Sequence, residues 1–336
     1  MSDQPIIVSA SPHVHSDRTS KSLMYDVVIA LIPAFLVSLY VFGYSALIVT
    51  AAAVISCLLF EYLIQKYWLK TEVTIGDGSA LITGILLAFN LPAGLPVWMV
   101  VVGSLVAIGI AKLSFGGIGY NIFNPALVGR VFLLVSFPVQ MTLWPTAVEN
   151  NTSLMDAVTG ATTLGLIKEG VQFGETMTTL SASIPSAQEM FLGITSGSIG
   201  EMSALALILG GVYLIARKVI SWHIPVTVLA SIAVMTGIFW WIDPEHYANP
   251  LIHVLSGGAI LGAFYMATDL VTSPVTKKGM VVFALGIGVI TVVIRLFGSY
   301  PEGISFAILI MNAFVPLINS YFKPRRFGSK IKAKIM

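Results

Sequence analysis

Long apolar runs separated by short polar intervals dominate the pattern of this chain. Most of the runs reach the roughly 20 residues that a helix needs to cross the hydrocarbon core of a bilayer. Ten can be distinguished, at residues 23–43, 46–66, 79–91, 97–114, 125–138, 201–217, 224–242, 251–267, 280–297 and 303–320. Because such continuous runs are typical of spanning helices rather than of barrel strands, the pattern predicts an all-α polytopic membrane protein with about ten transmembrane helices.

Two of the ten segments are short and carry helix-breaking residues. Residues 79–91 lie between "GDGS" and "PAGLP", and residues 125–138 have Pro at both ends. Segments interrupted by Gly or Pro are tolerated at membrane depth only where protein or a water-filled cavity covers the loose backbone. We therefore expect short, broken helices beside an internal site.

The two halves of the chain resemble each other weakly. The stretch "GSALITGILLAFNLP" (78–92) is similar to "GGAILGAFYMATDLVTSP" (257–274), and Gly84 of the first corresponds to Gly262 of the second. Each half holds five spans, an odd number, so the second copy would lie upside down relative to the first. The sequence thus predicts two inverted five-helix repeats, a plan in which broken helices line a central site.

These repeats would occupy residues 23–138 and 201–320. A cytoplasmic segment (1–22) would precede them, and a basic cytoplasmic tail (321–336) would follow. The interval 139–200 would be an insertion between the two copies.

Charge gives the expected orientation. Only 10% of the 336 residues are charged, against about 25% in soluble domains. With ten spans, one side of the membrane collects Arg18, Lys21, Lys66, Lys70, Lys112, Arg217, Lys218, Lys277, Lys278 and the basic tail. The positive-inside rule predicts cytoplasmic termini and places 139–200 in the periplasm or outside the cell. The net charge of +2 gives no indication of nucleic-acid binding.

The chain offers little chemistry of its own. Cys57 is the single cysteine, and no nucleotide-binding loop, zinc spacing or nucleophile triad is present, so we assign no catalytic or metal-binding residue. Chemistry would have to come from a bound cofactor, positioned by the protein. His13 and His15 are open to two interpretations, a metal or cofactor contact and a solvated segment.

A polar stretch inside the insertion, "DAVTGATTLG" (156–165), also has two interpretations. It could be a turn followed by a helix N-cap, since Thr and Asp favour both positions. It could also be a covalent attachment site, in which a threonine hydroxyl carries a phosphoester to a flavin phosphate. The residues alone do not decide between the two.

Several motifs, spread over nearly the whole chain, resemble one family of membrane flavoproteins. The motifs are "SPHVHS" (11–16), "DGSALITGILLAFNLP" (77–92), "GGIGYNIFNPALVGRVFLLVSFPVQMT" (116–142), "DAVTGATTL" (156–164), "FYMATDLVTSPVT" (264–276) and "MNAFVPLIN" (311–319). The family comprises the D subunit of the Rnf complex (RnfD) and the homologous B subunit of the sodium-pumping NADH:quinone oxidoreductase (NqrB).

The resemblance implies a covalently bound FMN. In the family, D-x-x-[ST]-[GS]-A-[TS] is the flavinylation signal, and its last hydroxyl bonds the FMN phosphate. Carried over, Asp156, Thr159, Gly160 and Ala161 would form the recognition motif and Thr162 would be the acceptor. A flavin transferase would be needed for maturation.

The resemblance further implies a subunit of an ion-translocating ferredoxin:NAD oxidoreductase in the bacterial inner membrane. It would exchange electrons with other Rnf subunits, especially the flavin-bearing G-type subunit, and the passage of electrons would be coupled to Na⁺ or H⁺ movement. A second, non-covalent flavin such as riboflavin would lie near "FYMATDLVTSP".

Three alternatives remain. One is the B-type quinone reductase subunit, although that subunit has a longer N-terminal extension than the segment 1–22 found here. Another is a secondary transporter for small solutes, which would share the inverted repeat. The third is a passive anchor for redox partners.

Other residues are weaker candidates for cofactor contacts. Asn124 precedes Pro125 and is either a helix cap or a contact. Arg130, inside a short apolar segment, could touch a phosphate, pair with an acid or extend to the interface. Intramembrane acids are commonly functional, so we expect Asp269 to form a flavin or ion pocket or an interfacial cap, and Asp77 likewise. The polar neighbours of Asp269 that we assign to such a pocket are Thr268, Thr272 and Ser273.

Overall fold

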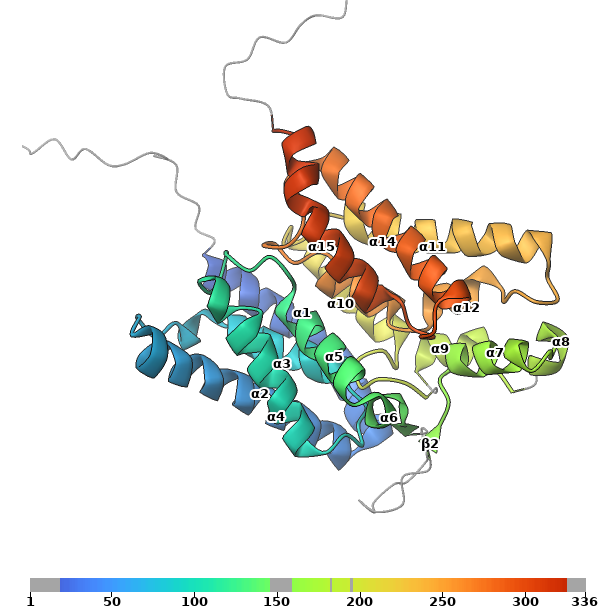
Figure 1. Cartoon of the computed structure of the whole chain (residues 1–336), viewed down its shortest axis with the longest axis horizontal. Helices are drawn as coiled ribbons and strands as arrows, with labels where there is room; N and C mark the ends of the chain where they lie inside the picture. The colour runs from blue at the N-terminus through green and yellow to red at the C-terminus, as the bar shows by residue number, and fades with distance from the viewer. Residues whose placement is uncertain (1–18, 146–158, 182, 194–195, 325–336) are drawn as a thin grey trace, which may run out of the picture.

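The long apolar segments form helices, which pair the backbone N–H and C=O groups that lipid cannot satisfy. The computed structural model describes residues 19–145, 159–181, 183–193 and 196–324 (Figure 1). Within these ranges, six helices are long and apolar enough to cross a membrane: Ser20–Phe42, Tyr44–Leu69, Val97–Phe115, His223–Ile242, Lys277–Phe297 and Ile304–Tyr321. Three shorter apolar helices accompany them: Ser79–Phe89, Pro125–Ser136 and Ala204–Ala216. The prediction of an all-α polytopic membrane protein is confirmed.

The first half of the chain forms one group of helices, coloured blue to green in Figure 1. It contains α1 (Ser20–Phe42), α2 (Tyr44–Leu63) continued by η1 (Ile64–Leu69), η2 (Ile75–Asp77), α3 (Ser79–Phe89), α4 (Val97–Leu105) continued by η3 (Val106–Ile110) and η4 (Leu113–Phe115), and α5 (Pro125–Ser136).

The second half forms a group beside it, coloured yellow to red (Figure 1). It contains α10 (Ala204–Ala216), α11 (His223–Ile242), α12 (Pro250–Leu255), α13 (Ala259–Leu261) continued by η5 (Gly262–Met266), α14 (Lys277–Phe297) and α15 (Ile304–Tyr321).

Short elements lie between the two groups in the chain. They are α6 (Pro138–Thr142), β1 (Trp144–Pro145), β2 (Thr159–Gly160), α7 (Thr163–Gln172), α8 (Met177–Leu180) and α9 (Ala187–Leu192). The short antiparallel pair β1–β2 is a small addition to the expected all-α fold. Leu164 and Ile167 of α7 form a small apolar cluster with Ala248, so this part packs on the loop between α11 and α12. We call this end of the molecule the Thr162 side.

The residues that fix where the two predicted short helices begin can be identified. Asn124 caps α5, since its Oδ1 accepts the N–H groups of Ala126 and Leu127, and Pro125 occupies the first helical position. The helix α3 begins after Gly78, whose positive φ of 84° ends the preceding turn.

The segment 251–267, expected to be one helix, is broken. Its chain leaves α12 at Ser256 and re-enters helix at Ala259. Gly257 and Gly258 both have φ of 66°, a conformation that L side chains rarely adopt. The expectation of a continuous span is therefore wrong, and the missing signal was the glycine pair.

The helices that correspond in the two halves run in opposite directions. Near the start of α1, Asp26 accepts a hydrogen bond from Tyr213 and pairs with Arg217, both at the end of α10. Similarly, Arg130 in the middle of α5 contacts Ser305 at the start of α15, while the Asn124 N–H at the start of α5 lies 3.2 Å from the Asn312 side-chain amide in the middle of α15. These antiparallel pairs support the predicted inverted repeat, whereas the domain limits at 23–138 and 201–320 stay a prediction.

The broken helices meet inside the bundle. Asn90, the C-cap of α3, donates to the Met266 sulfur at the end of η5, and Asn124 donates to the Met266 carbonyl at 3.3 Å. The side chains of Asn90 and Asn124 are buried. Two half-helices from opposite halves thus end against each other, and their first residues point to opposite ends of the molecule.

Candidate functional site

Thr162 caps the helix that follows it. Its Oγ1 accepts the backbone N–H of Gly165 at 3.1 Å, and its extended φ and ψ are those of an N-cap residue. The residue is 4% exposed. The capping interpretation of "TGAT" is therefore confirmed, and it leaves the hydroxyl at the N-terminal end of the ten-residue helix α7.

A small cavity, the Thr162 cavity, adjoins this hydroxyl. Its cavity volume is about 10 Å³, room for roughly one water molecule, and its walls are formed by Thr162, Thr163, Leu164, Met190, Ser196, Glu201, Leu255, Ser256 and Gly257. The unpaired N–H groups and the dipole of a helix N-terminus favour negative charge. The position therefore suits a phosphoester on Thr162.

The rest of the predicted motif is described only in part. Asp156 lies outside the described residues, as do His13 and His15. Gly160 pairs with Trp144 in the β1–β2 ladder, and Ala161 is partly buried. The backbone of Thr159 pairs with Pro145. The role of these residues in recognition stays a prediction.

The break between α12 and α13 is held by charged side chains next to the Thr162 cavity. Arg295 of α14 donates to the carbonyls of Ser256 and Gly257 at 3.0 and 3.1 Å, and to that of His253. Glu201, in the loop before α10, accepts the N–H of Gly257 at 3.2 Å. The guanidinium and the carboxylate therefore satisfy backbone groups that the broken helix leaves unpaired.

Arg130 pairs with an acid rather than with a phosphate or the interface. It forms an ion pair with Glu302 and donates to Asn90 Oδ1 at 3.2 Å. Arg130 is 5% exposed and Glu302 8%. We refer to Arg130, Glu201, Arg295 and Glu302 as the Arg130 cluster.

A larger pocket, the Asp269 pocket, lies beside the start of α1. Its cavity volume is about 90 Å³, and it is open at the protein surface. Among the candidates, Asn124, Thr268 and Asp269 line it, whereas Thr272 and Ser273 do not. Thr272 instead donates to Asp269 Oδ2 at 3.1 Å, and the Ser273 N–H donates to the Asp269 carbonyl. These two residues shape the loop that presents Asp269.

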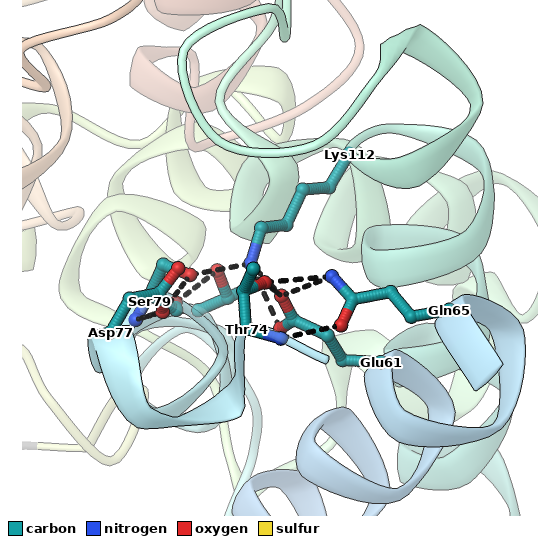
Figure 2. Close-up of polar contacts among 7 residues, drawn as sticks. Glu61, Gln65, Thr74, Asp77, Ser79 and Lys112 are labelled. Atoms are coloured by element: carbon teal, nitrogen blue, oxygen red, sulfur yellow. Dashed lines mark hydrogen bonds and ion pairs between the residues drawn. The ribbon is translucent and has the colours of Figure 1, made fainter. Parts of the chain in front are cut away.

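A buried polar network, the Lys112 network, borders the same pocket (Figure 2). Lys112 Nζ lies 2.8 and 2.9 Å from the two Glu61 carboxylate oxygens and 2.6 Å from Ser79 Oγ. Ser79 in turn donates to Asp77 Oδ1, which also accepts the Ser79 N–H. Asp77 thus binds the first N–H of α3, in agreement with the capping role that one of its two interpretations predicts.

The structure places Lys112 beside the start of α1, on the side that the charge pattern predicts. It lies inside the protein there, 3% exposed and paired with the fully buried Glu61. The ion pair compensates both charges, which explains why a lysine is tolerated there. Gln65 and Thr74 complete the network (Figure 2).

Comparison with known proteins shows the family to which the chain belongs. The sequence model of the NQR2, RnfD, RnfE family matches residues 7–328. The chain belongs to this family.

Relatives in the family are similar along their full length. The D subunit of the Na⁺-translocating ferredoxin:NAD⁺ oxidoreductase complex of Acetobacterium woodii is 47% identical, over 99% of this chain and 98% of its own. The D subunit of the proton-translocating complex of Clostridium ljungdahlii is 44% identical over 96% of each chain. The D subunit of an ion-translocating oxidoreductase complex of Halorhodospira halophila is 41% identical over 95% of this chain and 94% of its own.

The sequence analysis did not single out Glu302, although the weak internal repeat relates its position to that of Asn124. The offset in sequence that relates Gly84 to Gly262 also relates Asn124 to Glu302 and Ser79 to Gly257. Asn124 and Glu302 lie at the starts of α5 and α15. Ser79 and Gly257 lie at the starts of α3 and α13. Glu61, Glu201 and Arg295 carried no local signal, because their partners are distant in sequence.

Replacing Lys112 by Met should destabilise the protein strongly, since it leaves the Glu61 carboxylate buried without compensation. Breaking a buried ion pair from one side typically costs about 3–5 kcal/mol. The double variant Glu61→Gln/Lys112→Met should recover most of the loss. Thermal melting in lipid nanodiscs measures both. Equal melting temperatures for the single and double variants would contradict the pairing.

Proposed function

We propose that this chain is the D subunit of an ion-translocating ferredoxin:NAD oxidoreductase complex and carries FMN on Thr162 through a phosphoester. The observation that carries the proposal is the place of the Thr162 hydroxyl, at the N-terminus of α7 and beside a cavity, in a complete flavinylation motif. The names of the most similar relatives support it, because they are D subunits of such complexes.

In this proposal the protein positions the cofactor and balances its charge. A bound flavin supplies electron transfer in single steps. Thr162 Oγ1 holds the phosphate, and the N–H groups at the start of α7 stabilise its negative charge. The chain then works with partner subunits of the complex, including a flavin-bearing G-type subunit, and its maturation requires a flavin transferase.

The Asp269 pocket is our proposed site for a second, non-covalent flavin such as riboflavin. The pocket is open at one side and combines a few polar groups with mostly apolar walls, which is typical of small-molecule sites. Asn124, Thr268 and Asp269 supply polar groups, and Leu86 and Phe264 supply apolar walls. The pocket and the Thr162 cavity lie at opposite ends of the two half-helices, so electrons passing between them would cross the bundle.

We further propose an inner-membrane location with both ends of the chain in the cytoplasm and the Thr162 side in the periplasm. Among the orienting bases, Lys277 and Lys278 begin α14, while Arg217 and Lys218 follow α10. All four lie on the side where α1 starts, as the positive-inside rule requires. Electron passage would be coupled to Na⁺ or H⁺ transfer, the two ions named in the relatives.

Replacing Thr162 by Ala should abolish covalent flavin, because the ester oxygen is removed. The protein is produced together with an active flavin transferase, denatured and examined for in-gel flavin fluorescence. Thr163→Ala is the matched control, since this neighbouring hydroxyl lies outside the motif, and it should stay fluorescent. Thr162→Ser should also stay fluorescent. A dark wild-type band beside an active transferase would overturn the assignment.

Filling the Asp269 pocket should expel the second flavin without affecting the first. Val27 of α1 lines the pocket, whereas its neighbour Val28 faces a separate apolar groove. Val27→Trp should therefore remove most of the flavin that denaturation releases, and Val28→Trp should retain it. High-performance liquid chromatography of the released flavin, scaled to the covalent flavin, gives the ratio. Equal ratios in both variants would place the second flavin elsewhere or exclude it.

A further inference from the structure

The Thr162 hydroxyl is enclosed in the folded chain. The residue is buried, and its Oγ1 accepts the Gly165 N–H at 3.1 Å. The Thr162 cavity beside it has a volume of only about 10 Å³. A phosphate group with its oxygen atoms is larger than the single water molecule for which this space suffices. A transferase therefore cannot bring a flavin phosphate to the hydroxyl while its surroundings keep this arrangement.

The helix α7 forms part of the enclosure. Leu164 of α7 lines the cavity together with Ser256 and Gly257 of the break between α12 and α13. The contact with the break is close, because a methyl group added to Gly257 would come within 2.5 Å of the Leu164 side chain. Moving α7 away from the break would uncover the Thr162 hydroxyl.

The apolar contacts that hold α7 in place are few. The cluster beneath it contains the three buried residues Leu164, Ile167 and Ala248, edged by partly buried apolar side chains. The helix lies outside the segments that are long and apolar enough to span a membrane. Elements with few buried apolar contacts open at lower free energy than the core of a protein does. The helix can therefore open while the membrane helices stay folded.

One charged side chain adds a specific attachment. Lys168 of α7 donates to the carbonyls of Gly298 and Tyr300, the latter at 3.0 Å. Gly298 is the C-cap of α14, where carbonyls lack partners within the helix and the helix dipole favours positive charge. Lys168 thus ties α7 to the loop between α14 and α15.

We propose that α7 is a movable cover over Thr162, that a flavin transferase acts on the hydroxyl only when the cover is open, and that Lys168 is the latch that keeps it closed. The inference rests on the proposed function for the identity of the acceptor. The flavin donor would be a flavin dinucleotide, which carries an activated phosphate. The bond between Thr162 Oγ1 and phosphorus forms as the pyrophosphate bond breaks, the nucleoside monophosphate leaves, and the hydroxyl proton passes to solvent.

Thiol labelling measures the opening without any flavin. The variant Thr163→Cys places a reporter beside the acceptor, at a buried residue, and keeps the Thr162 cap. The native Cys57 is fully buried, so the unchanged chain in nanodiscs is the blank for labelling by a small maleimide. Adding Lys168→Met should raise the labelling rate about tenfold, the change in open population that losing hydrogen bonds to a charged group typically causes.

Three further variants in the reporter chain separate the latch from other effects. Lys168→Arg keeps the charge and the donors and should label close to the slow rate. Glu169→Gln, which removes the exposed neighbouring charge, should also label slowly. Ile167→Ala removes apolar packing under α7 without touching the latch or the cavity wall, and it should speed labelling as well.

Flavin attachment to the folded chain is the second readout. Protein with Thr163 intact, made without a transferase, is mixed in nanodiscs with the transferase and the flavin dinucleotide, and in-gel fluorescence gives the initial rate. Lys168→Met should accelerate attachment by about the same factor as labelling, because both reactions need the same opening.

The outcomes distinguish this inference from the proposed function. Labelling that neither Lys168→Met nor Ile167→Ala accelerates would overturn the cover, and Ile167→Ala serves alone if Lys168→Met fails to fold. Faster labelling with an unchanged rate of attachment would overturn the inference too, since the transferase would not use this opening. A chain that labels as expected but gains no flavin from an active transferase would overturn the proposed function and not the movable cover.

Discussion

The architecture depends on satisfying the polar groups that a broken helix exposes at membrane depth. Charged side chains do this at opposite ends of the bundle, and at one end the Asp77 carboxylate accepts the Ser79 N–H. Lys112, paired with Glu61, binds Ser79 at the start of α3, and Arg295 binds the carbonyls of Ser256 and Gly257 ahead of α13. Without such partners, unpaired backbone groups and charges would each cost several kcal/mol in an apolar interior. The cavity and the pocket that we assign to cofactors both lie next to these breaks.

Much of this arrangement follows from local sequence. The apolar runs predicted the helices, Asn124 and Pro125 predicted the start of α5, and the TGAT stretch predicted both a cap and an attachment site. The buried charges could not be predicted in this way. Glu61 and Lys112 are 51 residues apart, and Arg130 and Glu302 are 172 apart. A base after an apolar run has the same local pattern whether it is exposed or paired inside, so only the packing of the helices decides.

The proposed function uses the two ends of the bundle differently. At the Thr162 side, a hydroxyl on a helix N-terminus adjoins a cluster whose charges cancel. At the other side, an open pocket is bordered by Lys112 and Asp269. The two half-helices lie between these sites, and their C-terminal ends meet at Asn90 and Met266. A chain with this symmetry could carry solutes, but a flavinylation motif beside a helix N-terminus favours electron transfer.

The central claim is that Thr162 carries the flavin, and tandem mass spectrometry of the peptide containing residues 159–168 tests it most directly. The protein would be isolated from cells whose flavin transferase is active on another substrate protein. The account predicts fragment ions that place the added mass of an FMN ester on Thr162 and leave Thr159 and Thr163 unmodified. An unmodified Thr162 in such cells, or the added mass on another residue, would contradict it.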